Sequence, residues 1–212
     1  MATKQYTKGL QKLFTRVYGP TLPDGSALPV GVTEGDSLPA SMYVDLLEDD
    51  LCFALVNVNE PDGEDGGAYE VDHHADEYLS DVVVGSAGRP VWISELEPSF
   101  ITKHSDPLSL KKLEVVAAIG GVGSEVKFDC DDVTLVAVPD LAPKSEAIVL
   151  YKRVLLDPLP EPGDENDPAN IDLEASPLVA YFDGASVALD PNGSDVEVVI
   201  SGNGLMRWGI GA

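Results

Sequence analysis

Two adjacent histidines, His73 and His74, lie among acidic residues and form the most metal-like group of side chains in this 212-residue chain. Asp72, Asp76 and Glu77 place carboxylates on either side of them. Neighbouring side chains point about 100° apart on a helix and about 180° apart on a strand, so both imidazoles reach one ion only from a loop. We therefore favour a helix N-terminus capped by Asp72, with a metal site or a pH-sensitive contact as alternatives.

Two acidic turns carry oxygen ligands of the kind that Ca²⁺ prefers, namely residues 62–66 (DGEDG) and 190–195 (DPNGSD). Neither has the EF-hand order Asp-x-Asp-x-Asp-Gly with a glutamate at the twelfth position. A hairpin turn or a solvated loop is the favoured interpretation, and divalent-cation binding at subunit contacts remains the alternative. We expect no metal site and no cofactor within the chain itself.

The sequence offers no recognisable catalytic motif. Residues 120–123 (GGVG) resemble a phosphate loop only superficially, because no Lys-Ser or Lys-Thr pair follows them. There is no Gly-x-Ser-x-Gly elbow, and the third histidine, His104, lies in a polar stretch. No nucleophile, base and oxyanion hole can be assembled, so we expect no catalytic residues and a protein that is not an enzyme.

Composition and charge narrow the class of protein. The net charge of -24 argues against nucleic-acid binding over the main surface, because phosphate contacts need clustered Lys and Arg. The chain is 44% hydrophobic and only 7% aromatic, with 20 glycines and 16 prolines, which is typical of short strands joined by turns. No apolar stretch approaches the roughly 18–20 residues of a membrane helix, and no signal-peptide core is present, so we expect a soluble protein made in the cytoplasm.

Only two cysteines are present, Cys52 and Cys130, each inside an apolar or strand-like run. Buried free thiols are the favoured interpretation, over a disulfide or a metal pair.

The first eighteen residues differ in charge from the rest of the chain. Lys4, Lys8, Lys12 and Arg16 recur at every fourth position without an acidic residue among them, which predicts a basic amphipathic helix over residues 3–17. Its apolar stripe holds Tyr6, Leu10, Leu13, Phe14 and Val17. The helix either caps its own sheet or is an arm that docks on a neighbouring acidic subunit; contact with membrane or nucleic acid is the least favoured alternative. The candidate partner-binding residues are Lys4, Lys8, Leu10, Lys12, Phe14 and Arg16.

The remaining elements indicate an all-β fold, a β-sandwich or jelly-roll-like domain with this helix and one further short helix at 69–81. Expected strands are 41–47, 51–58, 82–84, 91–93, 111–119, 124–128, 132–138, 145–154, 177–183 and 194–201. Residues 95–110 and 155–175 read as acidic loops. We expect residues 1–40 to form a helix and linker arm and residues 41–212 to form one β-rich domain.

Six short pieces occur in an order that resembles a family of small β-rich virion structural proteins of tailed bacteriophages. They are Cys52 to Val56, His74 to Asp81, Phe128 to Val133, Ala147 to Lys152, Ser176 to Tyr181, and Trp208. The chain departs from the family pattern in its basic N-terminal segment, in the insertion at 155–175, and in residues 85–112.

The resemblance implies a non-enzymatic structural role in the virion, after synthesis in the host bacterial cytoplasm. The leading expectation is a head-decoration or cement protein that binds capsid subunits, with other phage capsid or tail proteins as partners, and that is a homo-oligomer. A tail, neck or collar component is the first alternative. A carbohydrate-binding or receptor-binding β-sandwich is the second.

Overall fold

The computed structural model describes about three fifths of the chain and shows a protein built mainly of β-strands. The described residues are 2–5, 27–28, 30–39, 42–56, 72, 74–84, 93–94, 97–98, 101–119, 123–138, 147–157, 170–183 and 193–210. Within them lie twelve strands and one short helix, and the named pairs of strands are all antiparallel. The broad prediction of a β-rich chain with very little helix is therefore confirmed.

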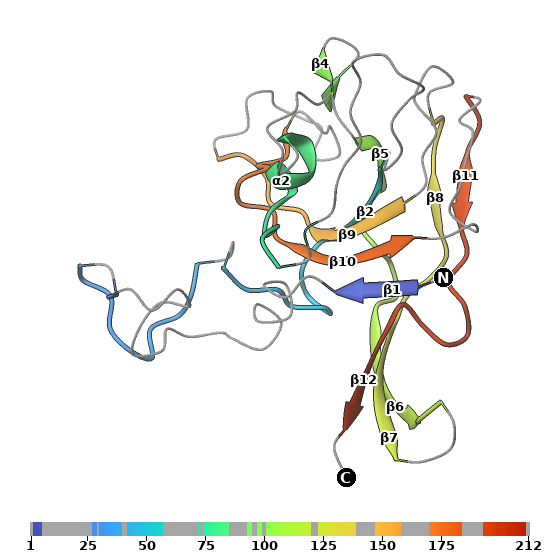
Figure 1. Cartoon of the computed structure of the whole chain (residues 1–212), viewed down its shortest axis with the longest axis horizontal. Coiled ribbons are helices and arrows are strands. Elements are labelled where there is room, and N and C mark those ends of the chain that lie inside the picture. Colours follow the sequence, from blue (N-terminus) through green and yellow to red (C-terminus); the bar gives the residue numbers. More distant parts are fainter. Residues whose placement is uncertain are drawn as a thin grey trace.

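A five-stranded antiparallel sheet forms the centre of the molecule, with the strand order β1-β10-β9-β2-β5 (Figure 1). Its strands are β1 (Ala2–Gln5), β10 (Leu178–Asp183), β9 (Ala147–Lys152), β2 (Leu51–Val56) and β5 (Ile101–His104). Every residue of β2 and β9 is buried, which follows from the apolar sequence of β2 and of most of β9; Lys152, at the end of β9, is buried together with its ion-pair partner Asp49.

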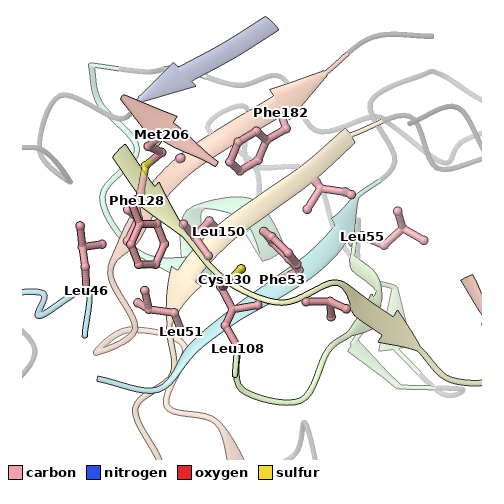
Figure 2. Close-up of a cluster of buried hydrophobic side chains, with 14 of the residues drawn as sticks. Leu46, Leu51, Phe53, Leu55, Leu108, Phe128, Cys130, Leu150, Phe182 and Met206 are labelled. Atoms are coloured by element: carbon pink, nitrogen blue, oxygen red, sulfur yellow. The ribbon is translucent and has the colours of Figure 1, made fainter. Parts of the chain in front are cut away.

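Each face of this sheet belongs to a separate hydrophobic cluster. On one face, Phe53, Leu150 and Phe182 meet Phe128 and Met206 from outside the sheet (Figure 2). The rings of Phe53 and Phe182 pack edge to face, with their centroids 6.2 Å apart. Such aromatic contacts add to the stabilisation that burial already supplies.

The opposite face is covered by the helix α2 (Leu79–Val84). Leu79 and Val82 of this helix pack against Cys52 and Tyr151 of the sheet. The helix begins where it does because Asp81 Oδ2 accepts the Tyr78 N–H at 2.9 Å, which satisfies a backbone donor at the helix start.

Three smaller sheets complete the described structure. A three-stranded sheet has the order β12-β7-β6, and two-stranded sheets join β11 to β8 and β3 to β4. Their bounds are β3 (Ile93–Ser94), β4 (Glu97–Pro98), β6 (Lys112–Ala117), β7 (Ser124–Asp129), β8 (Val133–Leu135), β11 (Val196–Val198) and β12 (Met206–Ile210). Figure 1 shows β6, β7 and β12 extending together away from the central sheet.

Three predictions about local structure were wrong. Residues 42–47 contain no strand, because Asp45 Oδ1 accepts the Leu47 and Glu48 N–H groups and closes a turn there. Residues 82–84 end the helix α2 instead of forming a strand. The predicted loop at 95–110 contains the strands β4 and β5, and β5 pairs with β2 at an edge of the central sheet.

The N-terminal helix predicted over residues 3–17 is also wrong at its beginning. Residues Ala2–Gln5 form β1, which pairs with β10 so that Lys4 lies opposite Tyr181. Pairing with β10 supplies backbone hydrogen bonds that four residues of an isolated helix end would lack. Residues 6–17 of the predicted helix lie outside the described residues.

The two ends of the predicted loop at 155–175 are joined by backbone pairing. Leu155 and Ile171 form an isolated antiparallel bridge, and Asn170 is only 2% exposed. Residues 170 and 171 are therefore buried rather than solvated, which corrects the prediction at this end of the segment. Residues 158–169 lie outside the described residues.

Candidate interaction surface

The strand β6 and its two ends carry a concentration of exposed apolar side chains. Among the residues that the structure describes, eight large hydrophobic side chains are exposed, and four of these lie within residues 110–119. They are Leu110 (74% exposed), Leu113 (43%), Val115 (71%) and Ile119 (70%). We call these four residues the β6 patch. Single exposed apolar residues are ordinary, whereas a group of them on one element marks an interaction site.

The strand register explains why these side chains are exposed. Leu113 lies opposite Phe128, and Phe128 lies opposite Met206, so the three share one face of the three-stranded sheet. Phe128 and Met206 are 0% and 2% exposed, because β7 and β12 pack on the hydrophobic cluster of Figure 2. Leu113 lies on β6, at the edge of the sheet, and the hydrophobic cluster that covers Phe128 and Met206 does not cover it. The apolar face is therefore buried over β7 and β12 and opens to solvent over β6.

The other face of the same sheet is charged and internally neutralised. Lys127 Nζ lies 3.0 Å from both Asp129 Oδ2 and Glu114 Oε2, and Lys112 Nζ lies 3.5 Å from Asp129 Oδ2. Arg207 donates to Glu125 at 2.9 Å. The three strands thus contain three cations and three anions. The whole net charge of -24 lies outside this sheet.

The ion pairs shift the pKa values of their members in the direction that strengthens them. Hydrogen bonds to Asp129 and Glu114 raise the pKa of Lys127. The hydrogen bond from Lys127 lowers the pKa of Glu114. Although burial opposes ionisation of Asp129, the bond to Lys127 and the nearby lysine charges lower the pKa of this carboxyl. All of these groups are charged near neutral pH, so the face is a ladder of ion pairs.

A shallow hollow of about 420 Å³ lies at the start of β6, lined by Leu110, Lys111, Lys112, Cys130 and Asp131. Both lysines are already engaged, because Lys111 Nζ donates to the Asp49 carbonyl and Lys112 pairs with Asp129. Burial raises the pKa of the Cys130 thiol to about 12, so this sulfur is protonated at neutral pH. Both cations that line the hollow therefore already have partners within the protein.

Of the six predicted partner-binding residues, Lys4 alone is among those that the structure describes. Lys4 lies in β1, opposite Tyr181, at an edge of the central sheet. The other five, Lys8, Leu10, Lys12, Phe14 and Arg16, lie outside the described residues.

The histidine cluster is organised by backbone capping. Asp72 Oδ1 accepts the N–H groups of His74 and Ala75, at 2.9 and 3.1 Å, and Asp76 Oδ2 accepts the Asp72 N–H at 2.9 Å. Asp72 therefore caps a single turn, as its sequence position suggested, although α2 begins only at Leu79. Within the described ranges no group of three or more His, Cys, Asp or Glu residues could hold a metal ion; His73 lies outside them.

Many aspartates serve the backbone in the same way. Asp195 Oδ1, from one of the predicted acidic turns, accepts the Ala137 N–H at 2.8 Å. In the part of the chain that the structure describes, nine aspartates accept backbone N–H groups: Asp36, Asp45, Asp49, Asp72, Asp76, Asp81, Asp132, Asp172 and Asp195. Part of the acidity of the chain is thus structural, since these carboxylates hold turns in place. The other predicted acidic turn, 62–66, lies outside the described residues.

Sequence reasoning identified residues 111–119 as a strand but missed the β6 patch. The only available signal was the run from Val115 to Ile119, which is apolar at successive positions although charged residues precede it. Such a run is typical of a central strand buried on both faces, and the sequence does not show that β6 lies at an edge.

Comparison with known proteins adds no relative: no protein-family model, curated protein or solved structure matches this chain. Among the described residues, no helix is long and apolar enough to cross a membrane. Function is therefore inferred from the residues of this chain and their arrangement.

Proposed function

We propose that this chain is a non-enzymatic structural protein of a tailed-bacteriophage particle and that it binds neighbouring subunits through the β6 patch. The exposed apolar strand is the single observation that carries the binding role. Val115 is 71% exposed on an edge strand that has no proline, a combination that soluble proteins normally protect. A partner that covers this strand removes apolar surface from water and satisfies the backbone groups along its edge.

The assignment to a phage particle rests on the ordered sequence pieces, and the positions of these pieces agree with an architectural role. Tyr151, in the Ala147–Lys152 piece, is fully buried in the central sheet. Ser176 is also fully buried, and its hydroxyl donates to the Asp172 carbonyl at 2.7 Å. Residues of this kind maintain a scaffold, which is what a virion subunit needs in order to present a binding surface.

We further propose that the fold is a β-sandwich in the wider sense. One face of the central sheet shares its hydrophobic cluster with Phe128 of β7, Leu135 of β8 and Met206 of β12. Sheets that pack face to face in this way bury a common core between their inner faces.

Within the particle, a decoration or cement protein on the capsid head is the leading version. A rigid domain with one apolar strand adds weak contacts that repeat across a symmetric lattice, and such contacts gain strength by avidity. A tail, neck or collar component would use the same surface at fewer places. A glycan-binding module is less favoured, because it would need exposed aromatic side chains and Trp208 packs against the hydrophobic cluster.

Antibody labelling of intact particles, read by electron microscopy, tests this proposal. Uniform label over the head is the expected result. Label restricted to the neck or tail would replace the decoration role with the tail alternative. Particles of the phage that encodes the chain which carry no label, although the antibody recognises the purified protein, would overturn the virion assignment.

A further inference from the structure

We propose that the outer edge of β6 pairs with β6 of a second copy of this chain, in antiparallel orientation about a two-fold axis at Val115. This inference deepens the proposed function, on which it rests, by naming the partner of the β6 patch. Four features of β6 support it: the direction of its outer backbone groups, the register in which two copies can pair, the lack of net charge on its sheet, and its exposed apolar side chains.

The backbone of β6 offers hydrogen-bonding groups on its outer side. Among the described residues, β7 is the only strand that pairs with β6. Ala118 donates its N–H to Gly123 O across the hairpin, at 3.3 Å. Because successive residues of a strand direct their N–H and C=O groups to alternate sides, those of Leu113, Val115 and Ala117 point away from β7. These three residues can therefore form a second ladder.

One register lets all three outward-pointing residues of β6 pair within the strand. With Val115 opposite Val115 of the second copy, Leu113 lies opposite Ala117 and Glu114 lies opposite Val116. All three outward-pointing residues then pair, and the apolar faces of the two sheets lie on the same side. Moving the axis to Glu114 would place two glutamates directly opposite each other, which is unfavourable. Moving it to Leu113 would extend the pairing to Leu110, whose φ of 46° is not that of a strand.

Charge also favours a second copy at this edge. Two molecules that each carry a net charge of -24 repel one another over most approaches. The sheet formed by β6, β7 and β12 carries no net charge, because its three cations and three anions are paired with one another. Two copies can therefore approach along β6 without net repulsion between the two sheets.

Pairing would also change the exposure of the β6 patch. Val115, the most exposed large hydrophobic residue within the strand itself, would lie beside its symmetry mate at the centre of a six-stranded sheet. Leu113 would lie beside Ala117 of the second copy. The joined apolar faces would form one continuous surface, and this surface is what the dimer would present to the particle.

A proline at residue 115 should weaken edge pairing between two copies without disturbing the fold of the monomer. Because the Val115 N–H points away from β7, Val115→Pro removes no bond within the sheet, and proline is tolerated at such edge positions. It does remove both hydrogen bonds of the central pair in the dimer. Val115→Thr is the matched control, since it keeps the N–H and the branched shape of valine.

Sedimentation velocity of the purified full chain is the test. We expect the wild type and Val115→Thr to sediment as dimers at micromolar concentration, and Val115→Pro to require at least tenfold more protein to dimerise. A wild type that stays monomeric throughout, or a Val115→Pro variant that dimerises like the wild type, would overturn the inference. If circular dichroism shows that Val115→Pro is unfolded, Val115→Lys replaces it, because two ammonium groups at the axis repel each other.

Cysteine cross-linking checks the register independently. Paired residues in a sheet lie close enough for a disulfide, so Val115→Cys should oxidise to a covalent dimer, whereas Val199→Cys, at an exposed site outside the sheet, should not. Equal cross-linking of both variants would contradict the register. A dimer that labels no particle would reject the virion assignment alone, and a monomer that labels particles would reject the dimer alone.

Discussion

At the scale of single residues, two buried ionisable groups, those of Cys52 and Tyr151, are held in their neutral forms. The Cys52 sulfhydryl and the Tyr151 hydroxyl share the same buried face of the central sheet. Burial raises the pKa of Cys52 to about 12 and raises the pKa of Tyr151 well above its usual range. Both groups are therefore neutral at physiological pH, and Cys52 lacks the thiolate that would make it a nucleophile.

Both cysteines should consequently be inert in the folded protein. Cys52 is 0% exposed and Cys130 is 9% exposed, and burial raises the pKa of each to about 12. We expect no reaction with a thiol reagent in native buffer at neutral pH, and reaction of two thiols per chain in denaturant. The exposed thiol of Val199→Cys serves as a positive control. Rapid native labelling of the wild type would show that one of the two thiols is accessible and ionised.

Lys152 is an ammonium buried under a loop. Its Nζ lies 2.9 Å from Asp49 Oδ2, donates to the Tyr43 carbonyl at 3.1 Å, and lies 4.5 Å from the centre of the Tyr43 ring. The lysine side chain is 5% exposed and that of Asp49 is 17% exposed. Water therefore reaches the carboxylate of Asp49 more easily than the ammonium of Lys152, so the ammonium depends more on the ion pair.

Asp49→Asn should destabilise the protein more than Lys152→Met. The asparagine variant leaves a buried ammonium without its carboxylate charge, which we expect to lower the free energy of unfolding by about 2–3 kcal/mol. The methionine variant keeps the packing of the stem and leaves a carboxylate that water reaches, at a cost of about 1 kcal/mol. Urea denaturation of both variants measures the difference. Equal costs, or the reverse order, would show that the loop and not the charge governs the effect.

At the scale of elements, the three-stranded sheet depends on one close approach of the backbone. Gly204, just before β12, has a φ of 76°, and a Cβ atom at this position would lie 2.6 Å from Phe128 O. The same carbonyl accepts the Leu205 N–H at 2.9 Å. The loop can thus enter β12 only with a glycine at this residue.

Gly204→Ala should lower the free energy of unfolding by about 2–3 kcal/mol, because the methyl group collides with backbone at a left-handed φ. Gly202→Ala is the matched control, since no heavy atom lies within 4 Å of its Cβ position. We expect this control to change stability by less than about 0.5 kcal/mol. Urea midpoints check both variants, and a tolerated Gly204→Ala would contradict the close approach.

The ion-pair ladder should make the stability of this sheet depend on pH at both ends of the range. Glu114 and Asp129 have lowered pKa values, so they stabilise the fold above their ordinary values of 4.5 and 3.8, and this contribution is lost as the pH falls through the folded values. Lys127 has a raised pKa, so its contribution is present below 10.5 and is lost as the pH rises beyond that value.

The loss of stability caused by Lys127→Met should therefore be largest at pH values above those at which Glu114 and Asp129 become protonated and below that at which Lys127 loses its proton. We expect the urea midpoint of the variant to fall well below that of the wild type at neutral pH, and the two midpoints to converge below about pH 4. Lys112→Met is the control, because the Lys112 side chain is 52% exposed and its pairs are longer. A difference between the wild type and Lys127→Met that stays constant over this range would mean that packing, and not charge, is at work.

At the scale of the whole molecule, the sequence predicted the centre of the fold better than its edges. The strand β2 was predicted because it is a compact apolar run that needs burial on both faces, and β9 was predicted from the run of apolar residues at its centre. Residues 82–84 misled, because three valines favour a strand, yet the Asp81 cap and the burial of Val82 against the sheet stabilise a helix. Tertiary packing overrode local propensity there.

Edge elements were harder to predict, since their partners are distant in the sequence. The strand β1 carries a lysine spacing typical of a helix, but pairing with β10, which follows more than 170 residues later, makes it a strand. The exposure of Val115 likewise depends on β6 pairing, among the described strands, with β7 alone. No local pattern distinguishes an edge strand from a central one, so the candidate surface emerged only from the structure.

Cross-linking mass spectrometry of intact phage particles, with a lysine-reactive reagent, would show whether this protein contacts its neighbours through the β6 patch. Lys111 and Lys112 stand at the start of β6, whereas Lys4 stands in β1 at the edge of the central sheet. We expect Lys111 and Lys112 to be joined to other particle proteins or to a second copy of this chain. Particles that contain no peptide of this chain, or cross-links confined to the N-terminal lysines, would contradict it.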